Sequence, residues 1–486
     1  MICVFGRALI AGAFATSLLA ANAAAPVADA AEEMDKAALR TLLAKHADVN
    51  AAQVDGMSAL HWAVFRDDTD AVRLLLDAGA NVKAANRYGV TPLSLACTNG
   101  NAPVIEMLLK AGADPNTVLP GGETALMTAS RTGRAEAVKV LIAHDASVNA
   151  REPKSGQTAL MWAAAEGNVE AIQALLKAGA NLHERLDSGY TPLLFAVREG
   201  RLNAARALLD AGADVNETVE PHKATGPSRP ASGAGWPRAG ESALLLAAAN
   251  AHFQLAAFLL DRGADPNAAA SGYTALHVVT VIRKPGLGDN DPAPEGSGNM
   301  TSLEFVKKMV EKGANVNARM TKAVKLGLTA LNTMGATPYF MAAKCADAEL
   351  MRLLVKLGAD PSITNADNST ALMAAAGLGT RSPGEDAGTE DEVVEALQVA
   401  LDLGADINAV DKNGETAMHS AAYKNSPKAV LFLASKGAKR EIWDRKNKEG
   451  WTPLTIAEGH RFGNFKPSLV TVEAFHQVMG IGESGR

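Results

Sequence analysis

The chain has 486 residues, of which 48% are hydrophobic, 21% are charged and only 5% are aromatic. This balance excludes a wholly disordered, collagen-like or low-complexity chain, and the scarcity of aromatic residues indicates many small cores instead of a few large ones. The 47 basic and 53 acidic residues give a formal net charge of −6. Such a charge provides no basic footprint for phosphates, so we expect no nucleic-acid partner.

The first predicted element is an N-terminal targeting segment over residues 1–23. It has one basic residue, Arg7, then an apolar stretch over 8–20 and the small-residue sequence Ala21-Asn22-Ala23. This order is typical of a secretory signal peptide, and the apolar stretch is shorter than the roughly 20 residues that cross a bilayer. We expect export, to the periplasm first and by secretion second, and no membrane-spanning segment in the mature chain. The alternative is an uncleaved anchor. Cleavage is expected after Ala23, Ala25 or Ala30.

Two residue patterns recur along the rest of the chain with a period near 33. The first is the triplet [ST]-[AP]-[LMY], which begins at Ser58, Thr91, Thr124, Thr158, Thr191, Ser242, Thr274, Thr337, Thr370, Thr416 and Thr452. The second is usually a glycine within L-L-x-x-G-A-[DN]-x-N, at Gly79, Gly112, Asp145, Gly179, Gly212, Gly263, Gly313, Gly358, Gly404 and Gly437. Two ladders in phase indicate a structural repeat.

Each repeat is predicted to contain two helices. The Ser or Thr hydroxyl caps the start of the first helix, and Pro or Ala follows it. The second helix carries apolar residues at helical spacing, such as Val72, Leu75 and Leu76, and ends at the glycine, which adopts a left-handed conformation most readily. The sequence therefore predicts an all-α repeat solenoid.

These patterns resemble the ankyrin repeat family, whose unit is a β-turn followed by two antiparallel helices. Thr91-Pro92-Leu93 through Gly112-Ala113-Asp114 is similar to a complete unit, and so is the stretch from Thr191 to Asn216. The resemblance implies one solenoid of stacked ankyrin repeats over 35–480, with about 11 repeats. The flanking parts are expected to be a flexible segment over 24–34, an N-terminal half-repeat cap at Leu39–Asn50, a final helix over 467–479 and a tail over 481–486.

Four insertions interrupt the repeats, and all lie between Glu217 and Asp391. Two fall at the hairpin edge, near 217–240 and 318–336, and two separate the helices of one repeat, near 283–300 and 378–391. Within the second, Ala318–Leu331 is expected to form a short helix or a strand. The insertions form either a specialised platform or lid, or tolerated solvated loops. The acidic stretch at 289–295 lacks the spacing of a calcium loop and is interpreted as solvated.

No catalytic or cofactor-binding motif is present, so we expect a non-enzymatic protein with no catalytic residue, cofactor or metal site. His61, His277 and His419 directly follow the repeated triplet. The family resemblance implies that they form structural hydrogen bonds between adjacent hairpins. Cys97 and Cys345 are expected to remain free thiols, because about seven repeats separate them.

The resemblance also implies which residues contact a partner: those at the hairpin tip, before the Thr, and at the end of the first helix. Carried onto this chain, these positions give Phe65, Arg66, Arg87, Tyr88, Arg131, Tyr190, Arg198, Tyr273, Tyr423, Lys424, Trp451 and Arg461. Exposed aromatic and arginine residues are the usual anchors of interfaces. The alternative is that the tyrosines pack between adjacent hairpins.

The function that the resemblance implies is protein–protein interaction through the concave face and hairpin tips, and we expect a monomer with a protein partner. Stacked repeats offer a large rigid surface at little ordering cost. One alternative is a small-ligand receptor or an enzyme whose site is built by the central insertions. The other is a secreted effector that binds a host protein.

Overall fold

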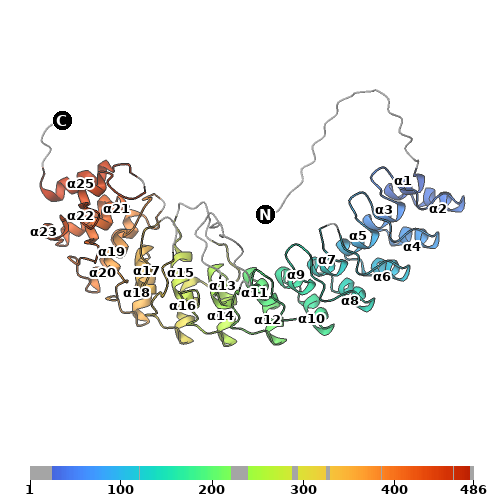
Figure 1. Ribbon diagram of the computed structural model, residues 1–486, viewed down its shortest axis with the longest axis horizontal. Helices are drawn as coiled ribbons and strands as arrows, with labels where there is room; N and C mark the ends of the chain where they lie inside the picture. The colour runs from blue at the N-terminus through green and yellow to red at the C-terminus, as the bar shows by residue number, and fades with distance from the viewer. Residues whose placement is uncertain are drawn as a thin grey trace, which may run out of the picture. The chain divides into compact units, whose positions relative to one another are not determined.

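The computed structural model describes residues 25–119, 121–220, 239–286, 294–324, 329–384, 386–463 and 465–481, and the described chain forms successive pairs of helices joined by loops (Figure 1). Contacts divide the chain into two compact units, unit 1 over residues 1–152 and unit 2 over 153–486, and each is described by itself. The sequence predicts one domain over 35–480, and that continuity stays a prediction. The signal peptide expected over 1–23 lies outside the described residues.

The residues of unit 1 that the structure describes form four helix pairs. Its first helices are α1 (Pro26–Glu32), α3 (Ala59–Phe65), α5 (Pro92–Asn99) and α7 (Ala125–Thr132). Its second helices are α2 (Lys36–Ala44), α4 (Thr69–Asp77), α6 (Ala102–Lys110) and α8 (Ala135–Ala143). Each first helix packs on its own second helix, and α1, α3 and α5 also pack on the first helix of the next pair, as stacked repeats require.

The described part of unit 2 forms eight such pairs. Its first helices are α9 (Ala159–Glu166), α11 (Pro192–Arg198), α13 (Ala243–Ala249), α15 (Ala275–Arg283), α17 (Pro338–Lys344), α19 (Ala371–Ala376), α21 (Ala417–Lys424) and α24 (Pro453–Ala457). Its second helices are α10 (Val169–Lys177), α12 (Leu202–Asp210), α14 (Phe253–Asp261), α16 (Ser302–Glu311), α18 (Ala348–Lys356), α20 (Glu390–Asp402), α22 (Pro427–Ser435) and α25 (Leu469–Met479). A short helix, α23 (Arg440–Trp443), precedes the last pair.

The predicted starts of the first helices are confirmed. Every Ser or Thr of the repeated triplet is the N-cap residue of a first helix and has an extended backbone. At α5, for example, the Thr91 hydroxyl accepts a hydrogen bond from the Ser94 N–H at 3.2 Å. The hydroxyl satisfies a donor that the helix start would leave without a partner, and replacing it with alanine costs about 1 kcal/mol.

The second helices end as predicted. Gly79 and Gly112 follow the last turns of α4 and α6 with φ values of 84° and 94°. His46 and Asp145 occupy the equivalent positions after α2 and α8, and they adopt the same left-handed conformation at 56° and 63°. The backbone turn is therefore imposed by the repeat even where a side chain makes it costly.

Histidines and asparagines join neighbouring repeats through hydrogen bonds. His61 Nδ1 lies 2.8 Å from Ser58 Oγ, and its Nε2 lies 3.0 Å from the carbonyl oxygen of Val90 in the next repeat. His277 and His419 repeat this arrangement, which confirms the predicted structural role. Burial lowers the pKa of all three, so they stay neutral near pH 7.

The asparagine that ends the G-A-[DN]-x-N phrase makes a second link. Asn267 donates from Nδ2 to the carbonyl oxygen of Gly313 at 2.9 Å, and its Oδ1 accepts from the N–H of Asn315 at 2.7 Å. Asn317 makes the equivalent pair of bonds in the following repeat. One side chain thus satisfies a backbone donor and a backbone acceptor of its neighbour.

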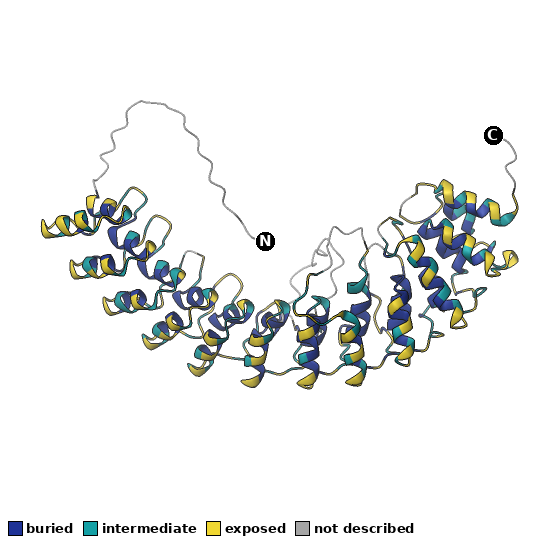
Figure 2. Ribbon diagram, turned by 180° about the vertical axis from the view of Figure 1, so that it is seen from behind, coloured by how far each residue is buried: buried dark blue, intermediate teal, exposed yellow. Residues whose placement is uncertain are grey.

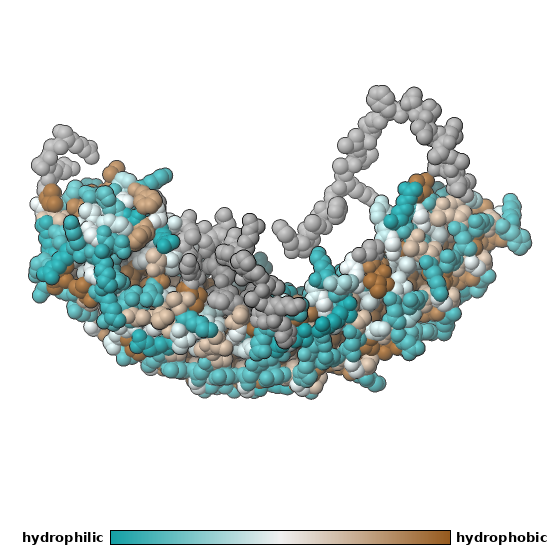
Figure 3. Space-filling model, viewed as in Figure 1, coloured by the Kyte–Doolittle hydropathy of each residue, from teal (hydrophilic) through white to brown (hydrophobic). Residues whose placement is uncertain are grey.

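The cores of both units follow the first helices. Figure 2 shows these helices mostly buried, whereas the second helices expose one side. The buried side chains are mainly Ala, Leu and Val, such as Val72 and Leu75 on α4. In Figure 3 the apolar surface on the face in view is broken into small patches between hydrophilic side chains. The expectation of many small cores is confirmed.

The N-terminal segment is helical, so the predictions of a flexible stretch over 24–34 and of a half-repeat cap at 39–50 are both wrong. α1 packs against α2 and α3, and Val27 and Ala28 are fully buried. α1 and α2 therefore form a complete pair. The sequence conceals this first helix because Ala25-Pro26-Val27 stands where Ser or Thr begins the later triplets, and no hydroxyl marks the helix start.

The insertions occupy the two edges that the repeat spacing predicts. A β-bridge joins Thr218 to Ser242 across the insertion 217–240, and insertions 283–300 and 378–391 connect α15 to α16 and α19 to α20. In the described part of 318–336, the predicted short helix or strand reduces to one β-bridge, from Thr329 to Thr380. The acidic residues 289–291 lie outside the described residues.

Candidate functional site

The end of α3 in unit 1 carries an aromatic and arginine cluster, which we call the α3 cluster: Trp62, Phe65 and Arg66. The two rings pack edge to face with their centroids 5.8 Å apart. The Arg66 guanidinium lies 5.7 Å from the Trp62 centroid and 5.8 Å from the Phe65 centroid. Its Nε donates to the carbonyl oxygen of Glu32 at the end of α1. Because Phe65 is 51% exposed, the cluster presents apolar and cationic surface together.

The remaining candidates in unit 1 are exposed as well. Arg87 and Tyr88 lie at a hairpin tip, and Tyr88 is 72% exposed. Arg131 lies at the end of α7, where its guanidinium is 3.9 Å from the carboxylate of Glu123. All five candidates of this unit, including Phe65 and Arg66, therefore present side chains to solvent.

In unit 2, by contrast, most of the candidate contact residues are buried. Five are buried: Tyr190, Tyr273, Tyr423, Lys424 and Arg461. The prediction that these five contact a partner is wrong, because a side chain closed within its own chain offers no surface. The Tyr273 hydroxyl, for example, lies 3.5 Å from Glu241, and Arg461 donates to the carbonyl oxygen of Tyr423 at 2.7 Å. The tyrosines thus pack within the chain, which is the alternative interpretation.

The last two candidates of unit 2 are half-buried. The Arg198 guanidinium lies 5.3 Å from the Tyr190 ring centroid and 4.9 Å from that of Phe195. The Trp451 ring packs edge to face on Phe462 at 5.0 Å. Both keep part of their surface accessible, and neighbouring rings fix their positions.

The carboxylate of Asp386, a residue of an insertion, forms ion pairs with two buried lysines. Asp386, in the insertion 378–391, accepts hydrogen bonds from Lys344 Nζ at 2.8 Å, from Lys424 Nζ at 3.2 Å and from the Thr380 hydroxyl at 2.5 Å. Burial opposes ionisation of Asp386, yet the two ammonium groups hold its pKa at about 2. The lysines end α17 and α21, so Asp386 fastens the insertion across two first helices.

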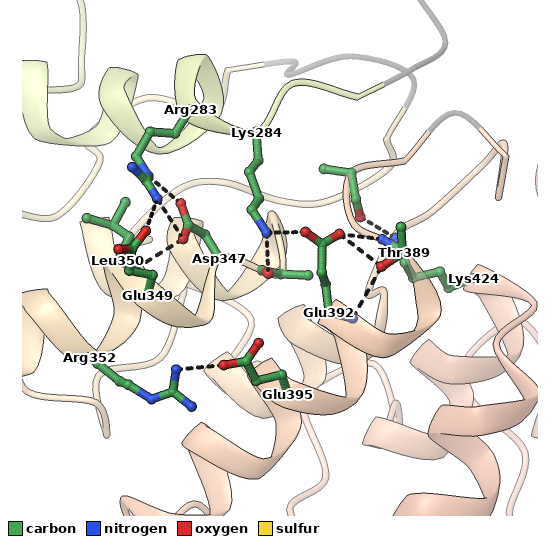
Figure 4. Close-up of polar contacts among 12 residues, drawn as sticks. Arg283, Lys284, Asp347, Glu349, Leu350, Arg352, Thr389, Glu392, Glu395 and Lys424 are labelled. Atoms are coloured by element: carbon green, nitrogen blue, oxygen red, sulfur yellow. Dashed lines mark hydrogen bonds and ion pairs between the residues drawn. The ribbon is translucent and has the colours of Figure 1, made fainter. Parts of the chain in front are cut away.

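A row of ion pairs fixes the ends of the insertions to the helix starts (Figure 4). Arg283, at the end of α15, donates from Nε to Asp347 at 2.6 Å, and Asp347 caps the start of α18. Lys284 donates to Glu392 in the first turn of α20, also at 2.6 Å. The hydrogen bonds from Lys284 and from the Thr389 N–H hold the pKa of Glu392 at about 2. The row spans three successive repeats.

Two insertions and the neighbouring hairpins of unit 2 enclose a cavity of about 260 Å³. The Ala330 N–H donates to the carbonyl oxygen of Gly379 at 2.7 Å, which joins insertion 318–336 to insertion 378–391. Gly379 has a φ of 73°, and a Cβ there would lie 2.5 Å from the Leu331 nitrogen, so this contact requires glycine. The cavity lining includes the apolar residues Leu331, Leu378 and Phe462 and the acidic residues Asp367, Asp411 and Glu415.

Sequence reasoning singled out neither Asp386 nor Glu415. Asp386 lies in an insertion, which has no periodicity to place it. Glu415 stands directly before a triplet Thr, a position that the repeat pattern marks, but the pattern does not show that Glu415 is buried whereas Glu123 at an equivalent position is half-buried.

Cys97 and Cys345 are free thiols, as predicted. Both are buried, and burial raises the pKa of each to about 12. Across the part of the chain that the structure describes, no three His, Cys, Asp or Glu side chains are grouped in a way that could hold a metal ion. Over the same residues, no helix combines the length and apolar character needed to span a membrane.

Capped helix pairs joined by histidine and asparagine bonds define a helical repeat protein. Models of ankyrin repeats in multiple copies match residues 27–119, 112–185, 148–219 and 389–434, and a model of the single ankyrin repeat matches 239–270 and 334–366. The chain belongs to the ankyrin repeat family.

Similar proteins contain the repeat within much longer chains. Inversin of Gallus gallus is 35% identical over 68 residues, which are 14% of this chain and 6% of that protein. Neurogenic locus notch homolog protein 2 of Homo sapiens is 35% identical over 147 residues, which are 30% of this chain and 5% of that protein. The chain therefore matches only a small part of either relative.

Two solved ankyrin repeat domains resemble parts of the chain. The human ASB11 domain has a TM-score of 0.41 and 28% identity, with 50% of this chain and 99% of that one covered. The domain of Bcl-3, a member of the IkappaB protein family, has a TM-score of 0.37 and 29% identity, with 41% of this chain and 90% of that one covered.

Proposed function

We propose that this chain is a non-enzymatic scaffold that binds a protein partner through the exposed helix ends and hairpin tips of unit 1. Ankyrin repeats are generally protein–protein interaction modules. The observation that carries the proposal is the α3 cluster, in which an exposed Phe65 lies beside Trp62 and Arg66. Tryptophan and arginine are enriched among the few residues that dominate interface energies.

The location of the insertions supports unit 1 as the binding surface. All four insertions lie in unit 2, where Lys424 is closed in by the insertion 378–391. In unit 1 no insertion interrupts the repeats, and Arg87, Tyr88 and Arg131 remain exposed on successive repeats. A row of exposed side chains that is held by a rigid stack loses little entropy on binding.

The test compares two variants of the full chain as baits. The triple variant F65A/R66A/Y88A removes the proposed anchors. The control R73A/D77A removes two exposed side chains from α4, a second helix that carries none of the proposed anchors. We expect proteins that the native chain and R73A/D77A both capture to be depleted at least about tenfold with the triple variant, since each anchor is worth about 2 kcal/mol. Quantitative mass spectrometry measures the depletion. Undiminished capture by a triple variant with a native melting curve would refute the surface.

We also propose that the chain is exported and acts as a monomer outside the cytoplasm. Support for export comes from residues 1–23, with Arg7, the apolar stretch 8–20 and the small-residue sequence that follows. A secreted effector that binds a host protein would use the same surface and differ only in its compartment.

A further inference from the structure

The cavity between the two joined insertions in unit 2 lies at the surface. Arg381, Lys448 and Glu449 line it and are exposed, and Phe462 is 45% exposed. Glu415 and Tyr423 also line it, and both are buried. Its volume of about 260 Å³ is below the roughly 300–1,000 Å³ of sites for drug-sized ligands, so it suits a small group.

Glu415 is the distinctive residue of this cavity, because it is buried with one oxygen unused. It is only 8% exposed. Its Oε1 accepts hydrogen bonds from Asn447 Nδ2 at 2.8 Å and from the Tyr423 hydroxyl at 3.1 Å. Its Oε2 is buried and accepts none from any residue that the structure describes. A buried acceptor without a donor destabilises the fold, and a ligand that donates to this carboxylate would offset that cost.

The other buried or half-buried carboxylates of the cavity are already engaged. Asp411 accepts from the Ser369 hydroxyl at 2.8 Å and, through its other oxygen, from the N–H of Glu415 at 2.9 Å. Asp367 accepts from Asn332 Nδ2 at 3.1 Å. Among the described residues that line the cavity, Glu415 alone has a buried side-chain oxygen without a hydrogen-bond partner.

The charge of the cavity favours a cation. Four carboxylates line it, those of Asp367, Asp411, Glu415 and Glu449, against two basic residues, Arg381 and Lys448. Lys448 Nζ donates to Asn413 Oδ1 at 3.2 Å, and both residues line the cavity. Burial and the nearby carboxylates of Asp411 and Glu449 raise the pKa of Glu415 to about 7.

We propose that this cavity binds a ligand with an ammonium or guanidinium group on an aliphatic chain, in which a cationic N–H donates to the Glu415 carboxylate and the chain packs on Leu331, Leu378 and Phe462. An anion would meet the carboxylates of Glu415 and Asp411. No described set of side chains suits a metal ion, which leaves an organic cation. The group comes either from a small free amine or guanidine or from a Lys or Arg side chain of a peptide.

The test is calorimetric titration of the full chain with butylguanidinium, butylammonium and the neutral analogue butylurea. We expect saturable binding of a cation at least about tenfold tighter than that of butylurea, because hydrogen bonds to charged groups are the stronger ones. The conservative variant E415Q should weaken cation binding at least about tenfold. The control E395Q, which changes an exposed carboxylate on α20 paired with Arg352, should bind as the native chain does.

Two further measurements distinguish a free cation from a peptide side chain and keep the test valid if E415Q does not fold. Acetyl-Gly-Arg-Gly-amide, compared with its citrulline analogue, binds more tightly than butylguanidinium if the natural source is a peptide side chain and no more tightly if it is a free cation. Should E415Q fail to fold, F462A removes an exposed ring and should weaken cation binding several-fold with an unchanged melting temperature. Equal affinity for butylguanidinium, butylammonium and butylurea, or native affinity in a folded E415Q, overturns the proposal.

Discussion

Single buried charges decide how the insertions of unit 2 are held. Lys344 and Lys424 are the last residues of the first helices α17 and α21. Their side chains are only 7% and 6% exposed, because Asp386 of the insertion 378–391 lies between them. A buried ion pair contributes little net stability over an apolar substitute, but removing one partner leaves an uncompensated charge. The contacts of Asp386 therefore matter most when one of them is lost.

We expect D386N to destabilise the folded chain by about 3 kcal/mol or more, because an amide leaves two buried ammonium groups without a counter-charge. Urea unfolding measures the loss. The matched control is E395Q, whose exposed pair with Arg352 should contribute less than about 1 kcal/mol. An equal loss in the free energy of unfolding for D386N and E395Q would show that Asp386 stabilises the fold no more than an exposed ion pair does.

The same variant should change the response to acid. The pKa of Asp386 is about 2 in the folded chain, below its ordinary value of 3.8, so its contribution is complete above that value and is lost as the pH falls through 2. The free energy of unfolding should therefore fall less between about pH 5 and pH 2 in D386N than in the native chain.

At the scale of elements, α1 is a helix that the sequence pattern does not predict, because its N-cap residue has no side chain that can accept a hydrogen bond. Its N-cap is Ala25, which has no side-chain hydrogen bond, whereas Ser58 caps α3 at the equivalent place one repeat later. Packing compensates for the missing hydroxyl: Val27 and Ala28 are fully buried, and the end of α1 accepts a hydrogen bond from Arg66 of the α3 cluster. α1 thus supports both the core of unit 1 and its proposed binding surface.

We expect a chain that begins at Ala31 to be less stable than one that begins at Ala24 by about 2 kcal/mol or more, since it loses the buried Val27 and uncovers α3. Urea unfolding of unit 1 measures the difference. Signal cleavage after Ala30 would cut within α1, so the mature protein should begin at Ala24 or Pro26, as its intact mass will show. Equal stability of the two chains would contradict the role of α1.

At the scale of the whole molecule, stability is expected to be local. Each repeat packs on its neighbours within a unit, so the stack behaves as a sum of nearest-neighbour terms. Each of the two units has its own buried first helices. Damage to one should therefore leave the other protected.

We expect L75A, at a fully buried position of α4, to cost about 2–5 kcal/mol in unit 1. Hydrogen exchange should accelerate across α2–α8 and remain native across α13–α25, as mass spectrometry of peptides will show. The converse variant L397A, at a fully buried position of α20, should accelerate exchange in unit 2 alone. Uniform acceleration in both units would contradict local stability.

The sequence by itself determined the repeat, because its signals are local. The Thr91 hydroxyl accepts a hydrogen bond from the N–H three residues further along, and Gly79 ends a helix because glycine readily adopts a left-handed backbone. Both signals act within a few residues and do not depend on the rest of the fold. Only the tertiary structure decided which contact positions remain open. Arg66 and Lys424 occupy the same position at the end of a first helix, yet Arg66 is exposed and Lys424 is buried, because Lys424 donates to Asp386 of the insertion 378–391. Burial depends on neighbours that insertions bring from outside the period, and no periodic pattern contains them.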